Sequence, residues 1–225
     1  MSSGTNDTIA AISTPPGEGG VGIVRLSGPE AVAIAAAAFL SSRGRDIRVS
    51  TQRVFHGWLR DARGDLLDEV LLHVMRAPHS FTREDVVEIN GHGGALPLNA
   101  MLEEVLKRGA RLAEPGEFTR RAFLNGRIDL VQAEAVMDQI QARTRTALQA
   151  ANAAAGGALS RALRALADAL AQVLAHVEAA VDFPEEDLPD LVTPALFDQA
   201  AQTHRRMLDL LETADSGRLY REGAT

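Results

Sequence analysis

The sequence of 225 residues contains no cysteine. This absence excludes disulfide bonds, thiolate metal ligands and a cysteine nucleophile, and it is typical of a reducing compartment. No apolar run approaches the ~20 residues that a membrane span needs. Met1 is followed by small polar residues rather than by the basic and apolar segments of a secretory signal. We therefore expect a cytoplasmic protein that does not contact a membrane.

An excess of positive charge is also missing. The chain has 23 Lys and Arg residues against 30 Asp and Glu residues, which gives a formal net charge of −7 and a sequence pI near 5.4. The overall charge therefore does not predict electrostatic binding of nucleic acid by the chain as a whole, although a local basic patch is compatible with it. With 46% hydrophobic and 24% charged residues, the composition is that of an ordinary globular protein.

Strand and helix patterns alternate up to about residue 113. Apolar runs rich in β-branched residues predict strands, and apolar residues at helical spacing predict helices. The expected strands are 8–13, 21–27, 54–59, 66–75 and 85–90, and the expected helices are 29–40 and 95–108. Pro29 suits the first position of its helix, and a turn at 61–65 joins two strands as a hairpin.

The composition changes after residue 118 or so, and from residue 130 it is dominated by Ala, Leu, Gln, Arg and Glu, which favour helices. Leucines and valines between 159 and 177 form a seam at helical spacing. We expect a break at 156–157, an acidic loop at 182–189 and a last helix at 194–214. The fold class predicted is an α+β N-terminal domain with a mixed sheet and helices, followed by an all-α partial helical bundle.

A glycine-rich turn, PPGEGGVG at 15–22, lies between two expected strands. It lacks the Lys-Ser/Thr pair of a phosphate-binding loop and is followed by a strand rather than by a helix N-terminus. We interpret it as a tight connection between strands, which could also form a dimer surface or cover a ligand.

The segment 80–94, SFTREDVVEINGHGG, combines apolar residues, a carboxylate and glycines. Glu88 interrupts a short strand, and three roles remain open for it: a structural ion pair, a general acid or base, or an anchor for a ligand. Arg25 interrupts another strand, where it either faces water at an edge or holds a carboxylate. His92 could carry a proton or bind a metal, but no second ligand stands at the spacing of a metal site.

Two aromatics and three arginines lie close together in FTRRAFLNGR at 118–127. This cluster could contact RNA. Alternatively, it is an amphipathic turn with Phe118, Phe123 and Leu124 inward and the arginines solvated. We favour the second interpretation for the phenylalanines and keep Arg127 as a candidate ligand contact.

Several long motifs occur in order along the chain. They are DTIAA at 7–11, TPPGEGGVGIVRLSG at 14–28, SFTRED at 80–85, GHGG at 91–94, PGEF at 115–118, RAFLNGRIDL at 121–130 and AAVDFP at 179–184. Together they resemble the N-terminal part of the MnmE (TrmE) family of tRNA-modifying GTPases, and the resemblance covers essentially the whole chain.

The resemblance implies an N-terminal domain similar to tetrahydrofolate-binding domains, which dimerises and binds a one-carbon tetrahydrofolate, in a formyl or methylene form. It implies a helical domain into which a GTPase domain is inserted. With the flavoprotein MnmG (GidA), such proteins place an aminomethyl-type group on the wobble uridine of tRNA. GTP, Mg and K belong to the GTPase domain, which we expect to begin beyond these residues.

The resemblance also assigns roles to residues. The folate contacts fall on Arg25, Glu88 and Arg127, and the turn from Gly91 to Gly94, with His92 and Gly93, could shape the site. Arg127 departs from the lysine of other family members, and a guanidinium replaces its charge but not its shape. We expect binding roles for these residues, no catalytic base and no metal.

The expected domains are residues 1–118 for folate binding and dimerisation, 119–218 for an incomplete helical domain, and 219–225 for a lead-in to the GTPase domain. Without that domain the chain is expected to be inactive as a GTPase. The competing hypothesis is an assembly scaffold, in which the first domain forms a dimer, the helices present a surface to a partner and Glu88 is structural. A freestanding folate-dependent aminomethyl-transfer enzyme is disfavoured by the cut-off helical half.

Overall fold

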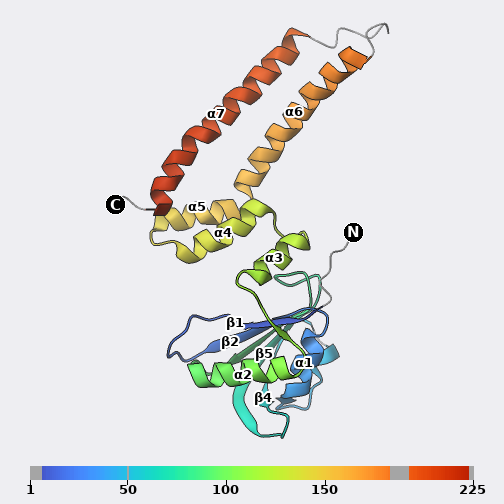
Figure 1. Cartoon of the computed structure of the whole chain (residues 1–225), viewed down its shortest axis with the longest axis vertical. Coiled ribbons are helices and arrows are strands. Elements are labelled where there is room, and N and C mark those ends of the chain that lie inside the picture. Colours follow the sequence, from blue (N-terminus) through green and yellow to red (C-terminus); the bar gives the residue numbers. More distant parts are fainter. Residues whose placement is uncertain (1–6, 50, 183–192, 223–225) are drawn as a thin grey trace. The chain divides into compact units, whose positions relative to one another are not determined.

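The chain forms two compact units in the computed structural model, Met1–Ile128 and Asp129–Thr225. The structure describes residues 7–49, 51–182 and 193–222 (Figure 1). The expected fold class is confirmed, because the first unit contains a mixed sheet with helices and the second is entirely helical where it is described.

The first unit is built on a seven-stranded sheet with the order β3-β4-β5-β6-β2-β1-β7. Neighbouring strands run antiparallel, except that β1 and β7 are parallel. The strands are β1 (Ile9–Ile12), β2 (Gly22–Ser27), β3 (Phe39–Ser41), β4 (Arg53–Arg60), β5 (Leu66–Met75), β6 (Val86–Gly91) and β7 (Arg111–Leu112).

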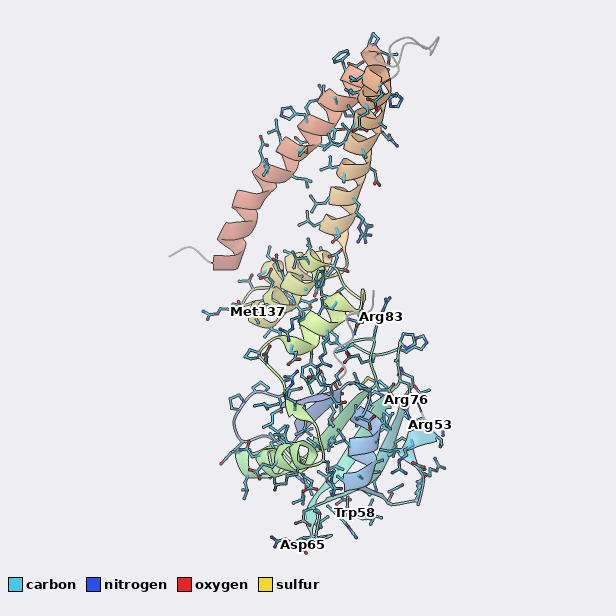
Figure 2. The ribbon with its side chains drawn as sticks, turned by 45° about the vertical axis from the view of Figure 1, so that its right-hand side comes forward. Arg53, Trp58, Asp65, Arg76, Arg83 and Met137 are labelled. Atoms are coloured by element: carbon cyan, nitrogen blue, oxygen red, sulfur yellow. The ribbon has the colours of Figure 1, made fainter. Side chains whose placement is uncertain are left out.

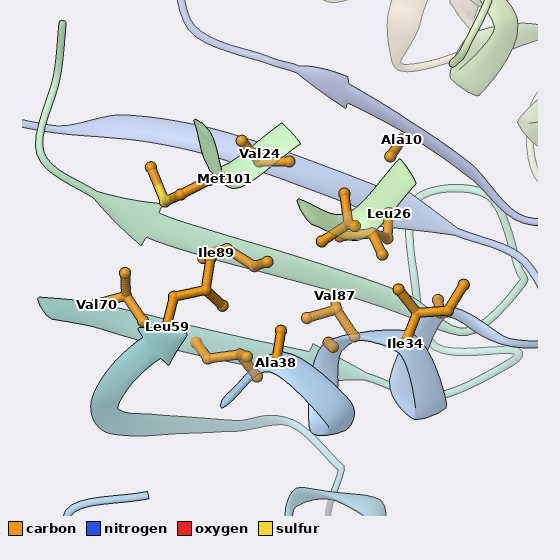
Figure 3. Close-up of a cluster of buried hydrophobic side chains, with 14 of the residues drawn as sticks. Ala10, Val24, Leu26, Ile34, Ala38, Leu59, Val70, Val87, Ile89 and Met101 are labelled. Atoms are coloured by element: carbon orange, nitrogen blue, oxygen red, sulfur yellow. The ribbon is translucent and has the colours of Figure 1, made fainter. Parts of the chain in front are cut away.

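Two helices, α1 (Ala31–Ala38) and α2 (Ala95–Lys107), pack against one face of this sheet (Figures 1 and 3). Alternate residues of the central strands point into the core between sheet and helices, as the two-residue period of a strand requires. The buried cluster includes Val24, Leu26, Val70, Leu72, Val87, Ile89, Ile34, Leu98 and Met101. The intervening residues of β2 and β6 therefore lie on the opposite face, which we call the second face.

The sequence predicted most of these elements but not the short ones. The expected hairpin is present, and Asp61 Oδ1 closes its turn by accepting the backbone N–H groups of Arg63 and Asp65, both at 2.9 Å. The helix expected at 29–40 is shorter, since it begins after Glu30. Its expected last residues instead form β3, because their backbone pairs with β4. Pairing across the sheet thus overrides local helix propensity.

In its described residues, 129–182 and 193–222, the second unit contains four helices. They are α4 (Leu130–Gln141), α5 (Arg145–Ala155), α6 (Ala158–Asp182) and α7 (Pro194–Glu222). Asp129 caps α4 in a capping box with Gln132, and Thr144 caps α5. The expected break at Gly156 and Gly157 separates α5 from α6, as predicted. The last helix runs beyond residue 214, through most of the expected lead-in segment.

The leucine seam of α6 is less buried than its spacing predicts. Leu166 is 8% exposed, whereas Leu163 is 46% and Leu174 is 55% exposed. The amphipathic helix itself is confirmed, but within the described residues most of its apolar stripe is not covered. The acidic loop expected at 182–189 lies, beyond Asp182, outside the described residues.

A third helix of the first unit, α3 (Glu117–Leu124), follows β7. The compact unit ends after it, at Ile128, and the expected domain bounds stay a prediction. Arg121 of α3 forms ion pairs with Asp7 and Glu84, which also belong to the first unit. The assignment of functions to the two parts of the chain stays a prediction.

Candidate ligand-binding site

Arg25 and Glu88 face each other across the two central strands. They are direct partners in the antiparallel register of β2 and β6, so their side chains share the second face. Arg25 donates from Nε to Glu88 Oε1 at 2.8 Å, and its second guanidinium nitrogen lies 2.7 Å from the same oxygen. The side chains are 28% and 20% exposed, so the pair is partly open to solvent.

Both arginine contacts use one carboxylate oxygen. Among the hydrogen bonds between described residues, Glu88 Oε2 accepts none. A carboxylate oxygen has two lone pairs and only accepts, so this oxygen is available to a donor from outside. Arg25 thus holds the carboxylate of Glu88 in one orientation and leaves half of its acceptor capacity unused.

Aromatic rings flank the two candidate arginines. The guanidinium of Arg25 lies 5.6 Å from the ring centre of Phe118, at the start of α3. The guanidinium of Arg127 lies 4.9 Å from the ring centre of Phe81, in the loop before β6. Such contacts stabilise a cation over the ring face by about 0.5–1 kcal/mol at exposed sites. They also orient the two guanidinium groups.

A buried ionic network fixes α3 to the sheet. Arg121 is 2% exposed and contacts three carboxylates, at 2.7 Å from Asp7, 3.1 Å from Glu117 and 3.2 Å from Glu84. Arg111 binds Glu117 through two nitrogens, at 2.7 and 3.1 Å. Because a buried charge is costly without partners, each of these groups depends on the others.

Hydrogen bonds of the same network connect strand β2, the loop before β6 and the end of α3. Ser27, two residues after Arg25 on β2, is within hydrogen-bonding distance of Thr82 at 2.6 Å and donates to Glu84 at 2.7 Å. Asn125, at the end of α3, donates to the carbonyl oxygen of Thr82 at 2.7 Å. The loop that contains Phe81 and the helix that contains Phe118 are thereby held on the strand of Arg25.

Glu117 is the electrostatic centre of this network, with a fully buried side chain. The hydrogen bonds from Arg111, followed by the N–H of Glu114 and the side chain of Arg121, outweigh its burial and lower its pKa from 4.5 to about 2. Glu117 is therefore ionised at neutral pH, and its charge is balanced within the network.

His92 is held by Asp68 at the end of β6. Its backbone N–H donates to Asp68 Oδ2 at 2.7 Å, and its Nδ1 lies 2.7 Å from Asp68 Oδ1. The hydrogen bond to Asp68, supported by the charge of that carboxylate, raises the pKa of His92 above 6.5. The ring is 68% exposed, whereas Asp68 is largely buried.

The glycines around His92 permit close approach by other parts of the protein. A Cβ atom on Gly91 would lie 2.4 Å from Asp68 Oδ2, and one on Gly93 would lie 2.2 Å from the carbonyl oxygen of Gly19. Gly94 adopts a φ of 141°, which side chains disfavour. The turn at 91–94 therefore packs against the glycine-rich connection between β1 and β2, which joins antiparallel neighbours as predicted.

The structure brings two of the three predicted folate residues into contact. Arg25 binds a carboxylate, so the alternative in which it merely faces water at an edge is wrong. Glu88 has the ion pair of its structural alternative, and its unused oxygen keeps the anchoring role open. Arg127 is exposed, and among the contacts between described residues its guanidinium meets the ring of Phe81 rather than Arg25 or Glu88.

The expectation for 118–127 is wrong in two respects. Arg121 is buried in the ionic network rather than solvated or free for RNA, because three carboxylates converge on it. Phe123 and Leu124, expected to point inward, are 40% and 51% exposed. The face of α3 that is buried includes Glu117, Arg121 and Ala122 instead.

Sequence reasoning missed the residues that support the site. Glu84, Glu117 and Arg121 lie within the motifs SFTRED, PGEF and RAFLNGR, so their presence in long motifs was a signal. Their pairing was not visible, because the partners are separated by up to 114 positions along the chain. Asp68, the partner of His92, had no such signal.

Two general properties of the described residues bear on function. They contain no group of three or more His, Asp or Glu side chains arranged to hold a metal ion. In the same ranges, every helix is too short or too polar for a transbilayer segment.

Two family models match the sequence, one for each compact unit. Residues 8–127 match the model described as the N-terminus of the GTP-binding protein TrmE. Residues 130–225 match the MnmE helical domain. The two matches meet within two residues of the division between the units at Ile128 and Asp129.

Curated relatives agree with the family models. Proteins named tRNA modification GTPase MnmE are 51% identical in Enterococcus faecalis and 53% identical in Chloroflexus aurantiacus, over 96% and 97% of this chain. The relative in Syntrophobacter fumaroxidans is 49% identical over 99% of this chain. The matches cover 47–48% of these relatives, so the chain spans about half of their length.

Proposed function

Because the chain belongs to the MnmE (TrmE) family of tRNA modification GTPases, we propose that its first unit binds a one-carbon tetrahydrofolate and forms a homodimer. The observation that supports this proposal best is the ion pair of Arg25 and Glu88 on the second face of the sheet, which is partly exposed to solvent and leaves one carboxylate oxygen of Glu88 without a donor among the described residues. The pair lies in the centre of the sheet, beside the ring of Phe118 and on the face opposite to α1 and α2.

Glu88 is suited to anchor the pterin ring. A reduced pterin presents a ring N–H and an exocyclic amino group side by side, and a carboxylate accepts from both. Oε2 of Glu88 has no donor among the described residues, and Oε1 is oriented by Arg25. The ligand therefore needs no rearrangement to gain the first hydrogen bond, and Arg25 yields or shares the second.

Arg127 is suited to the other end of the ligand. Its guanidinium is exposed and is oriented by Phe81 at 4.9 Å. The glutamate tail of a folate bears carboxylates, which a planar guanidinium binds with two parallel hydrogen bonds. Phe81 and Phe118 offer apolar surface near the two arginines. The turn at Gly91 to Gly94 shapes the rim of the site in this proposal.

The chemistry on tRNA requires more than these residues. We infer that the chain supplies the folate site and the dimer, while GTP with Mg and K acts in a GTPase domain that belongs to the other half of the relatives' length. The flavoprotein MnmG is the proposed partner for modification of the wobble uridine. None of the folate residues needs to transfer a proton, so no catalytic base is assigned. The expected cytoplasmic location stays a prediction.

The folate site is tested by titrating 5-formyltetrahydrofolate into the purified chain. Glu88→Gln is expected to weaken binding roughly 10-fold to 100-fold, because a charged acceptor contributes about 1.5–3 kcal/mol. The matched control is Glu69→Gln, which removes an exposed carboxylate paired with His56 and leaves binding unchanged. Equal affinity of Glu88→Gln and the wild type would rule out the anchoring role.

The assembly scaffold remains a second candidate, because Glu88 is in fact ion-paired. The second face also carries apolar side chains that a second copy would cover: Val54 is 60% and Leu71 is 49% exposed. Sedimentation at micromolar concentration separates the two proposals. A dimer that binds no folate favours the scaffold, whereas a monomer contradicts dimerisation in both.

A further inference from the structure

Positive charge is concentrated at one edge of the sheet. Residues 41–63 contain six arginines against two aspartates, a formal charge of +4, while the rest of the chain carries −11. The arginines are Arg43, Arg45, Arg48, Arg53, Arg60 and Arg63. We call this set the arginine edge, because it surrounds the edge strand β3 and its neighbour β4.

The arginines of this set are exposed and largely unpaired. Arg48 has a loose contact with Asp46, at 3.8 Å. For the other five, no acidic side chain of the described residues lies within ion-pair distance. By contrast, Arg121 and Arg111 of the same unit are paired with carboxylates. Within the described residues, most of the positive charge of the arginine edge is therefore not taken up by ion pairs.

The two aspartates of the segment are occupied by local backbone. Asp46 accepts the N–H of Arg48 at 2.9 Å, and Asp61 accepts two N–H groups of its turn. These bonds to the turn, opposed in part by burial and supported by the charge of Arg63, lower the pKa of Asp61 below 3.8. Both carboxylates therefore have part of their acceptor capacity taken up by local backbone N–H groups.

The arginines stand on both sides of the exposed strand β3. A hollow of about 270 Å³ is bordered by Arg45, Arg48 and Asp46, and a second hollow of about 510 Å³ is bordered by Arg60, Arg63 and Asp61. Both hollows share Phe39 and Leu40 of β3. Figure 2 shows Arg53, at the start of β4, and Arg76 on the same side of the first unit.

We propose that the arginine edge binds the phosphate backbone of an RNA. Separate positive groups around an edge strand match a polymer with repeated negative charges, and guanidinium groups bind phosphate with two hydrogen bonds each. Leu40 offers apolar surface between them. The inference rests on the proposed function, because the relatives' names identify tRNA as the polyanion of this family. An acidic protein is the alternative partner.

The test measures binding of an unmodified tRNA transcript to the purified chain. One variant replaces Arg43, Arg45, Arg60 and Arg63 with glutamine. The matched control removes the same charge from exposed arginines of the helical unit, at Arg143, Arg145, Arg205 and Arg206.

We expect the edge variant to bind at least tenfold more weakly at about 100 mM salt, and the control to change by less than threefold. For four lost phosphate contacts, the slope of log K against log salt falls by roughly 3. Trp58, the only tryptophan, pairs with Leu40 in the register of β3 and β4. Its fluorescence is expected to change when tRNA binds the wild type but not the edge variant.

Three results would overturn the proposal: no binding of tRNA by the wild type, equal losses in the edge variant and the control, or displacement of tRNA by polyglutamate of equal charge. Unchanged thermal unfolding of the edge variant shows that its loss is not a loss of fold. Titration of 5-formyltetrahydrofolate into the same proteins separates this proposal from the folate proposal, because the edge variant is expected to bind folate normally.

Discussion

Arg121→Met is the most informative change for the architecture around the site. Methionine keeps much of the side-chain volume and removes the positive charge that three carboxylates share. Breaking a buried ion pair from one side costs about 3–5 kcal/mol. The lower end applies here, because Glu117 keeps its bonds from Arg111, and Asp7 is 42% exposed.

We therefore expect a loss of about 3 kcal/mol in the free energy of unfolding of the first unit, which lowers its Tm by roughly 10 °C. The neighbouring residue supplies a matched control. Arg120 is 54% exposed and contacts Glu114 at 3.1 Å and Glu117 at 3.5 Å. Arg120→Met is expected to cost less than about 1 kcal/mol, as for other exposed ion pairs.

Fluorescence of Trp58 follows this unfolding selectively, since the only tryptophan lies in the first unit. Denaturant titrations of the two variants and the wild type give the differences in free energy. If the free energy of unfolding of Arg121→Met is within 1 kcal/mol of the wild type, or no lower than that of Arg120→Met, the network does not hold α3 on the sheet. The proposed orientation of Phe118 and Phe81 would then need another cause.

Three further changes test single contacts. The pKa of Glu117 is lowered to about 2, so its stabilisation is complete above pH 4.5 and is lost as the pH falls toward 2. Glu117→Gln should remove about 3 kcal/mol of this pH dependence, measured by denaturant titration from pH 2 to 6; an unchanged pH profile would contradict it. Asp68 raises the pKa of His92, so the His92 contact is strongest below pH 6.5 and weakens as the pH rises through the raised value. In Asp68→Asn, an NMR titration should show a lower pKa for His92, and an unaltered value would refute the pairing. Gly93→Ala places a methyl group against a backbone oxygen at 2.2 Å and is expected to cost roughly 1–3 kcal/mol, whereas Gly20→Ala enters open space. Equal thermal stability of these two variants would show that the turn is free to move.

The long elements of the fold were predictable because each has its own period. The five longer strands and α2 carry clear apolar alternation or helical spacing, and the β4–β5 turn has strong turn residues. The short strands β3 and β7 were not predictable from the sequence. With three and two residues they are too short to show a period, and they form by pairing with a neighbouring strand.

The candidate site was predictable only in part. Arg25 and Glu88 stand out because each interrupts an apolar strand, but their pairing depends on the register of β2 and β6. Arg121 resembled a solvated residue of an amphipathic helix. Its burial follows from carboxylates at positions 7, 84 and 117, which only the tertiary fold brings together.

In the proposed function, the pair of Arg25 and Glu88 binds the pterin ring of a one-carbon folate. A crystal structure of the chain with 5-formyltetrahydrofolate tests it most directly. We expect the ring N–H and amino group within about 3 Å of the Glu88 carboxylate oxygens, with the ligand on the second face of the sheet. A ligand bound elsewhere, with the pair between Arg25 and Glu88 unchanged, would contradict it.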